Sequence, residues 1–211
     1  VANSITQPGL DFIDRFTGLT NPTIPYPPVD SSRNDTLNLG LRFWVGYGHN
    51  EYIDNFTVRM GGGEKDANVT VKVHGTNWVR NYFVPAHTFV ISEPIPRRGA
   101  SGAELLTEGI SDRGISIEST EPIAVFSYSG GELSSTGSTM LLPVSAYAYE
   151  YYALTYSQYN IEISGNFNVH SWFYVIADHD STLVEITPNN PTLGGRAKVV
   201  PSTVMLNKGE G

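Results

Sequence analysis

The chain lacks cysteine altogether. It therefore has no disulfide framework, no thiolate nucleophile and no thiolate-bound zinc. A run of 18 apolar residues is also missing, so no stretch is long enough to cross a membrane as a helix, and we expect no membrane insertion. The lack of cysteine does not fix the compartment, because many extracellular β proteins of this size are stable without disulfides.

Positive charge is scarce as well. The chain has 13 Lys and Arg against 21 Asp and Glu, which gives a net charge of −8. Its only adjacent basic pair is Arg97-Arg98. Because the neutralisation of phosphates needs clustered cations, we expect neither a nucleic acid nor an anionic membrane as partner.

Helical periodicity is the third absence. No window keeps a 3.6-residue apolar period for three turns without a Gly or Pro, whereas the chain holds 21 Gly and 13 Pro. Apolar residues make up 40 % and aromatic residues 11 % of the sequence, which is typical of a folded chain. We therefore predict an all-β fold built of antiparallel β-sandwich units.

The stretch from 114 to 156 is the hydrophobic and aromatic centre of the sequence. Isoleucines alternate with polar residues in 114–118, which predicts a half-buried strand. A turn is expected at 119–122, because Pro122 has no N–H to give to a ladder and suits the first position of a second strand, 123–128. Further strands are predicted at 41–47, 55–60, 68–74, 78–84, 88–91, 103–107, 167–176, 182–187, 197–200 and 203–206.

Three parts are expected along the chain. Residues 1–38 form an extended, Pro-rich lead-in or arm, since four of the seven residues 22–28 are proline. A first β-sandwich unit covers 39–145, and a second, incomplete β unit packed on the first covers 146–211. This division rests on an internal repeat with a period of about 115 residues. It predicts one and a half copies of one unit, within a longer polypeptide or completed by strands of a neighbour.

The repeat is carried by two pairs of segments. Residues 70–73 and 83–89 resemble residues 183–186 and 199–204 in the same order.

One short cluster has several metal-ligand side chains together, Asp178-His179-Asp180. With ligands from elsewhere it would suit Ca²⁺ or Zn²⁺. We favour a polar turn instead, because the spaced carboxylates and bend glycine of a calcium loop are absent. No metal and no cofactor are expected.

Catalytic patterns are also weak. No serine lies in a Gly-x-Ser-x-Gly elbow, and nothing in the sequence brings Glu118, Glu132 and Glu150 together as a glycosidase pair. We expect no enzyme.

Aromatic residues are the better lead to a binding site. Trp78, Tyr147, Tyr149 and Tyr159 are candidates for stacking on sugars or for contact with a protein. A sandwich of this size also needs large core residues, so a core position is the favoured interpretation for each tryptophan, and above all for Trp44 and Trp172.

Three N-glycosylation sequons begin at Asn34, Asn55 and Asn68, a number that the composition gives by chance. They invite, without deciding, a glycoprotein interpretation.

The central stretch resembles the IgGFc-binding protein N-terminal domain family. The matching residues are Gly114, Ile115, Ile117, Ser119, Pro122, Ile123, Ala124, Val125 and Phe126, then Leu142, Pro143, Ser145, Ala146, Glu150, Tyr151, Tyr152 and Tyr156. The resemblance covers about residues 39–211, and it departs from the family at Tyr147-Ala148, where Leu-Gly is usual. It implies an extracellular or cell-surface β-rich module of larger mucin-like or adhesin-like proteins, without enzymatic activity. It supplies no binding residues.

The function we predict is a non-catalytic extracellular or cell-surface module for adhesion, ligand binding or matrix assembly. Its partners would be an extracellular protein, a glycan or other copies of itself. One alternative is a structural subunit of an extracellular filament or sheath, completed by strand exchange with a neighbouring chain. A carbohydrate-active enzyme is the minor alternative.

Overall fold

The computed structural model describes residues 38–48, 55–130, 137–154 and 171–211. All of them lie in one compact unit, Leu37–Gly211. The sequence predictions for Asn34, Glu132, Tyr159 and residues 167–170 concern residues outside the described part.

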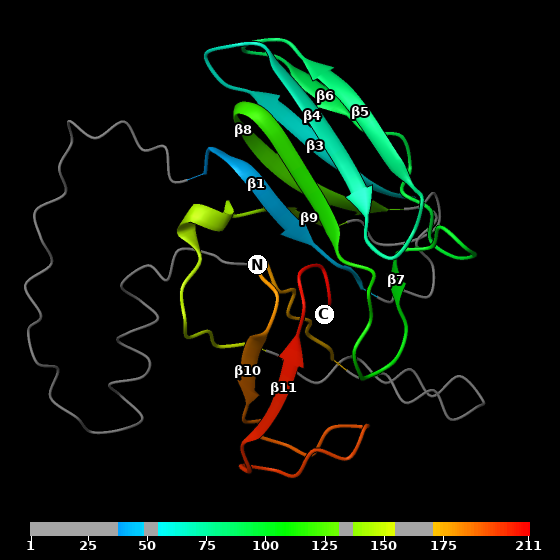
Figure 1. Cartoon of the computed structure of the whole chain (residues 1–211), viewed down its shortest axis with the longest axis vertical. Coiled ribbons are helices and arrows are strands. Elements are labelled where there is room, and N and C mark those ends of the chain that lie inside the picture. Colours follow the sequence, from blue (N-terminus) through cyan, green and yellow to red (C-terminus); the bar gives the residue numbers. More distant parts are fainter. Residues whose placement is uncertain (1–37, 49–54, 131–136, 155–170) are drawn as a thin grey trace, which may run out of the picture. The chain divides into compact units, whose positions relative to one another are not determined.

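The described part is all-β, as the sequence predicts (Figure 1). Its strands are β1 (Gly40–Val45), β2 (Tyr47–Gly48), β3 (Asn55–Gly62), β4 (Ala67–Val73), β5 (Val79–Val84), β6 (Phe89–Ile91), β7 (Glu104–Leu105), β8 (Ile115–Gly130), β9 (Gly137–Met140), β10 (Thr182–Ile186) and β11 (Ser202–Leu206). One 3-10 turn, η1 (Val144–Ala146), follows β9. The described residues contain no helix long and apolar enough to cross a membrane.

β8 is the strand on which the seven-stranded main sheet is built. Along one edge its first half pairs with β4 and its second half with β3. Along the other edge it pairs with β1 and then with β9, and all four pairings are antiparallel. β5 continues the sheet beyond β4, and β6 continues it beyond β3. β2 and β7 form a separate two-residue parallel pair.

The expected turn at 119–122 is wrong, because β8 runs through it as one strand. Ser119 still pairs with Val69, and Ile123 pairs with Gly62, so the ladder resumes across the gap. Side chains replace the interrupted ladder: the backbone N–H of Asn68 donates to Thr120 Oγ1 at 3.0 Å. Pro122 therefore lies where no cross-strand partner needs its missing N–H.

The two halves of the main sheet enclose one hydrophobic core in a sandwich-like or barrel-like arrangement. Alternate residues of each strand point into it, which is the period-2 pattern of the sequence. The fully buried side chains with the largest volumes are Tyr47, Phe43, Met60, Ile115, Ile117, Ile123, Val58, Val69, Val71, Val73, Val84 and Val125. Burial of each aliphatic side chain contributes about 1.5–3 kcal/mol, so this cluster is the main source of stability.

The outer face of β1 and β2 is covered by the C-terminal part of the chain. A Cβ added at Gly40 would lie 2.2 Å from Pro143, and one added at Gly48 would lie 1.7 Å from the ring of Trp172. Glycine at these positions lets the covering segment approach the strands closely. The end of β1 is thereby buried on both faces, since Trp44 and its neighbour Val45 are both buried.

The predicted buried strand at 167–176 is wrong over its described residues. Residues 171–177 form no strand, and Trp172 is 48 % exposed. One side of its ring rests on Gly48, and the ring stacks with Tyr174 at 5.8 Å between centroids. The unbroken apolar run thus packs over Gly46 and Gly48 without forming a strand.

β10 and β11 form a C-terminal hairpin, in register from Thr182 opposite Leu206 to Ile186 opposite Ser202. The chain beyond it returns to the main sheet, where Gly114 N–H donates to the Gly209 carbonyl at 3.0 Å. The strands predicted at 182–187 and 203–206 are found, whereas 197–200 is not a strand.

The pairing of this hairpin does not repeat that of the main sheet. In the sequence alignment of the two units β11 corresponds to β6, yet β10 pairs with β11 while β4 pairs with β5. The structure therefore does not confirm one and a half repeats. The divisions at 38 and 145 stay predictions.

The corner of β8 yields a direct test. A Cβ at Gly63 would lie 2.5 Å from the carbonyl oxygen of Pro122, so alanine must push the β3–β4 connection away from the corner. We expect Gly63→Ala to lower the free energy of unfolding by about 1–3 kcal/mol in urea denaturation. Gly137→Ala is the control, because its Cβ would meet only Ser129 Oγ at 3.5 Å. Equal stability of the two variants would contradict this packing.

Candidate functional site

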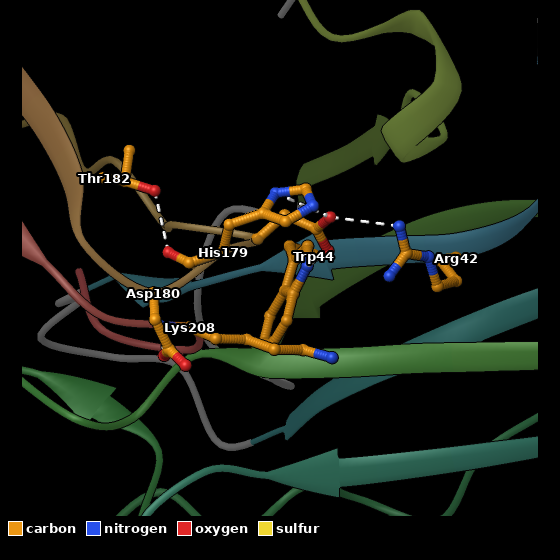
Figure 2. A network of polar contacts seen from close by, with 7 residues as sticks. Arg42, Trp44, His179, Asp180, Thr182 and Lys208 are labelled. Carbon is orange, nitrogen blue, oxygen red and sulfur yellow. Dashed lines mark hydrogen bonds and ion pairs between the residues drawn. The ribbon is translucent and has the colours of Figure 1, made fainter.

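The turn Asp178-His179-Asp180 is the first candidate, and Figure 2 shows its polar contacts. Asp178 is buried, and its Oδ1 accepts a hydrogen bond from Trp44 Nε1 at 2.7 Å. Its Oδ2 accepts a hydrogen bond from Arg42 Nη2 at 3.1 Å. The Asp178 carboxylate therefore fixes the turn to β1.

The remaining groups of the turn also have internal partners. Asp180 Oδ1 accepts a hydrogen bond from the backbone N–H of Lys208 at 3.0 Å, and Thr182 Oγ1 donates to the His179 carbonyl at 2.7 Å (Figure 2). Among the described residues, no three His, Cys, Asp or Glu side chains are grouped to hold a metal ion. The geometry is that of a polar turn that ties β10 to the main sheet.

The tyrosine candidates lie in different environments. Tyr149 is fully exposed, and Tyr147 is partly exposed with its hydroxyl near the Trp44 backbone. Burial raises the pKa of the Tyr147 hydroxyl to about 12, so this group stays protonated. Tyr159 lies outside the described residues.

Trp78 is wrong as a surface candidate. Its side chain is only 5 % exposed and belongs to the hydrophobic core, just before β5 begins. A large aromatic residue beside a turn looks accessible in the sequence, but here the turn folds it inward. Of the sequon asparagines, Asn55 and Asn68 are exposed on β3 and β4.

The exposed segment is longer than the candidates chosen from the sequence. Tyr151, Tyr152 and Leu154 are also exposed, and residues 147–154 form no strand. The backbone N–H of Ala148 donates to the Tyr151 hydroxyl at 2.7 Å, and the Tyr152 hydroxyl donates to Glu150 Oε1 at 2.7 Å. The sequence pattern that could have identified this segment is its lack of apolar–polar alternation. Without alternation the segment has no face on which its rings can be buried.

A polar pocket of about 180 Å³ lies on the outer face of β4 and β8. It is lined by Thr70, Lys72, His74, Ser116, Glu118 and Lys208. Burial, and next the charge of Lys72, lowers the pKa of His74 below its usual 6.5. The neutral imidazole lies beneath Gly209, where an added Cβ would be 2.2 Å from Nδ1, and beside the Trp44 ring at 4.8 Å. The C-terminal loop that contains Lys208 and Gly209 therefore packs beside this pocket.

The carboxylates considered for catalysis have separate surroundings. Glu118 lines the polar pocket, and Glu150 accepts the hydrogen bond from Tyr152. Each has polar neighbours of its own, and neither is placed as one half of an acid–base pair by the described contacts.

The contact between Trp44 and Asp178 predicts a graded effect on stability. Asp178→Ala leaves the buried indole N–H without an acceptor, and we expect it to lower the free energy of unfolding by about 1–3 kcal/mol. Asp178→Asn keeps one acceptor oxygen and should cost less. Chemical denaturation followed by tryptophan fluorescence measures both, with Glu185→Ala on an exposed position of β10 as control. A loss as small as the control's would show that the turn is not fixed through Trp44.

His74 predicts a pH dependence. Because the pKa of His74 is lowered in the folded chain, the folded chain binds fewer protons than the unfolded chain once the pH falls below 6.5. The free energy of unfolding is therefore unaffected by the protonation of this histidine above pH 6.5 and decreases as the pH falls. We expect the midpoint of thermal unfolding to fall less for His74→Gln than for the natural chain between pH 7.5 and 5. His87→Gln, at an exposed histidine, should keep the natural dependence. Identical pH profiles for all three proteins would refute this role.

Comparison with known protein families gives a match to part of the chain. The family model described as IgGFc binding protein matches residues 137–211. These residues include β9, the exposed tyrosines, the Asp178 turn and the C-terminal hairpin. Neither the curated proteins nor the solved structures yielded a significant match.

The matched family is one of non-enzymatic binding domains that are typically extracellular. Residues 137–211, which cover the outer face of β1 and carry the exposed tyrosines, thus match the IgGFc-binding protein family that the sequence resembles.

Proposed function

We propose that the chain is a non-catalytic module that binds a protein partner outside the cell through its exposed tyrosines. The exposure of neighbouring apolar side chains carries this proposal. Tyr149 is fully exposed, and the exposed fractions of the others are Tyr151 67 %, Tyr152 83 % and Leu154 89 %. We call residues 147–154 the tyrosine segment.

Tyrosine suits this role for physical reasons. Its ring gives a large contact area with only two side-chain torsions to fix, and its hydroxyl adds a hydrogen bond. Tyrosine is also enriched among the residues that dominate the energy of protein interfaces. A cluster of such rings in water therefore favours a protein partner over a purely structural role.

The tyrosine segment is held at its start by the main sheet. Pro143, just before η1, packs on Gly40, and the Tyr147 hydroxyl lies against the backbone of Trp44. This attachment reduces the conformational entropy that binding would otherwise cost. The segment also lies within residues 137–211, which match a binding-domain family. Both facts support adhesion or matrix assembly as the setting in which the module works.

An array of candidate partners tests binding by the tyrosine segment. The labelled full chain would be applied to secreted proteins and glycans, including the antibody Fc fragment after which the matched family is named. We expect protein hits that weaken at least about tenfold in the double variant Tyr149→Ser/Tyr152→Ser, because two interface anchors are lost.

Leu193→Ser is the matched control, since this exposed leucine lies in the loop between β10 and β11. It should bind as the natural chain does. An array without protein hits, or hits that the double variant retains at full strength, would refute the proposal. Hits on glycans alone would favour sugar recognition instead.

A further inference from the structure

A second surface lies on the outer face of β3, β6, β8 and β9, on strands other than the tyrosine segment. It contains a shallow pocket of about 380 Å³, which we call the Arg59 pocket. Its lining residues are Arg59, Phe89, Ile91, Phe126 and Ser138. Nothing in the proposed function makes use of it.

Strand register builds this pocket. Arg59 of β3 lies opposite Ile91 of β6 on one side and opposite Phe126 of β8 on the other. Gly61, two residues along β3, lies opposite Phe89, whose ring covers it, since a Cβ there would be 2.9 Å from Phe89 Cε1. The glycine leaves room for a concave surface between the larger side chains.

The walls of the pocket are apolar and open to water. Phe89 is 71 % exposed and Ile91 is 57 % exposed, and Met140 of β9 lies opposite Phe126 in the same row. Contiguous apolar surface of this kind on a folded domain commonly marks an interaction site.

The single cation in the lining has no acidic partner among the residues that the structure describes. Arg59 Cζ lies 4.1 Å from the centroid of the Tyr128 ring, and its buried Nε has no hydrogen-bond partner in the same part of the chain. Other arginines there do form ion pairs with carboxylates: Arg42, Arg80, Arg97, Arg98 and Arg196. In a chain with net charge −8, an arginine held among apolar side chains in this way leaves a buried donor without a hydrogen-bond acceptor.

We propose that the Arg59 pocket binds an acidic side chain flanked by apolar side chains on a peptide segment of a partner protein. A guanidinium forms its strongest hydrogen bonds with a carboxylate. The apolar walls exclude water, which strengthens that ion pair, and they take up the flanking apolar groups. The stacking on Tyr128 holds the guanidinium in place before binding.

Other classes of ligand fit the pocket less well. A polyanion such as a nucleic acid needs several cations, and Arg59 is the only one among the described lining residues. A sugar needs several fixed polar groups besides aromatic rings, and the lining offers the Ser138 hydroxyl and one guanidinium. One carboxylate with apolar neighbours matches both the charge and the walls.

The test uses the full chain and three capped peptides as probes. The first is acetyl-Ser-Leu-Asp-Phe-Ser-amide, the second carries Asn in place of Asp, and the third carries Ser in place of Leu and Phe. Titration followed by two-dimensional NMR gives each dissociation constant. We expect the first peptide to bind at least about tenfold more tightly than the other two, since a charge-assisted pair and apolar burial act together.

Variants assign the effect to residues. Arg59→Met keeps the bulk and should abolish the preference for Asp over Asn, whereas Arg59→Lys should keep part of it. Phe89→Ser should weaken the two peptides that contain Leu and Phe. Phe83→Ser is the control, because this exposed phenylalanine lies on β5, away from the pocket lining. The Tyr149→Ser/Tyr152→Ser variant should bind the peptides unchanged, which separates this proposal from the previous one.

Several results would overturn the proposal. Equal binding of the Asp and Asn peptides, no binding of any peptide, or an unchanged preference in Arg59→Met would each do so. If Arg59→Met fails to fold, the comparison of the Asp and Asn peptides on the natural chain still decides. Sedimentation that shows a dimer for the natural chain and a monomer for Phe89→Ser, without peptide selectivity, would identify a second copy as the occupant and refute a peptide partner.

Discussion

Backbone pairing along both edges of β8 positions the strands of the main sheet. Residues 115–119 and 123–130 pair with four different strands, two along each edge, and the strand continues between them through a corner that holds a proline. Because both edges are occupied, β8 leaves few backbone groups without a partner. The core residues of both halves of the main sheet are placed by this one ladder.

The inner and outer faces of the main sheet differ in how far other side chains cover them. Inward residues alternate along each strand and form a single core, so they have little freedom to vary. The outer faces then differ: one part of β1 is covered by the C-terminal segment, while the face that contains Arg59 is left to solvent. The tyrosine segment begins where the chain covers β1, because Pro143 packs on Gly40 and Tyr147 lies against the backbone of Trp44. Both proposed binding surfaces lie where the chain leaves side chains uncovered.

Much of the fold could be predicted from local pattern. The alternation of valines in β4 and of isoleucines at the start of β8 predicted strands correctly, because the period of two is a local property. The turn predicted at 119–122 was wrong, since the partner that bridges the corner, Asn68, is 52 residues from Thr120. Trp172 was expected in the core and is 48 % exposed, whereas Trp78 is buried and is lost as a binding candidate. Cover by another segment is not encoded in the neighbouring residues. Arg59 gave no signal at all, since its place among apolar side chains is a property of the register of three strands.

A continuous β8 forms the rigid base from which the tyrosine segment extends uncovered. Amide hydrogen exchange of the full chain tests it most directly. We expect uniformly slow exchange for residues 115–119 and 123–130, as one cooperative unit, together with fast exchange for residues 149–154. Independent opening of the two halves of β8, or slow exchange throughout residues 149–154 in the free chain, would contradict it.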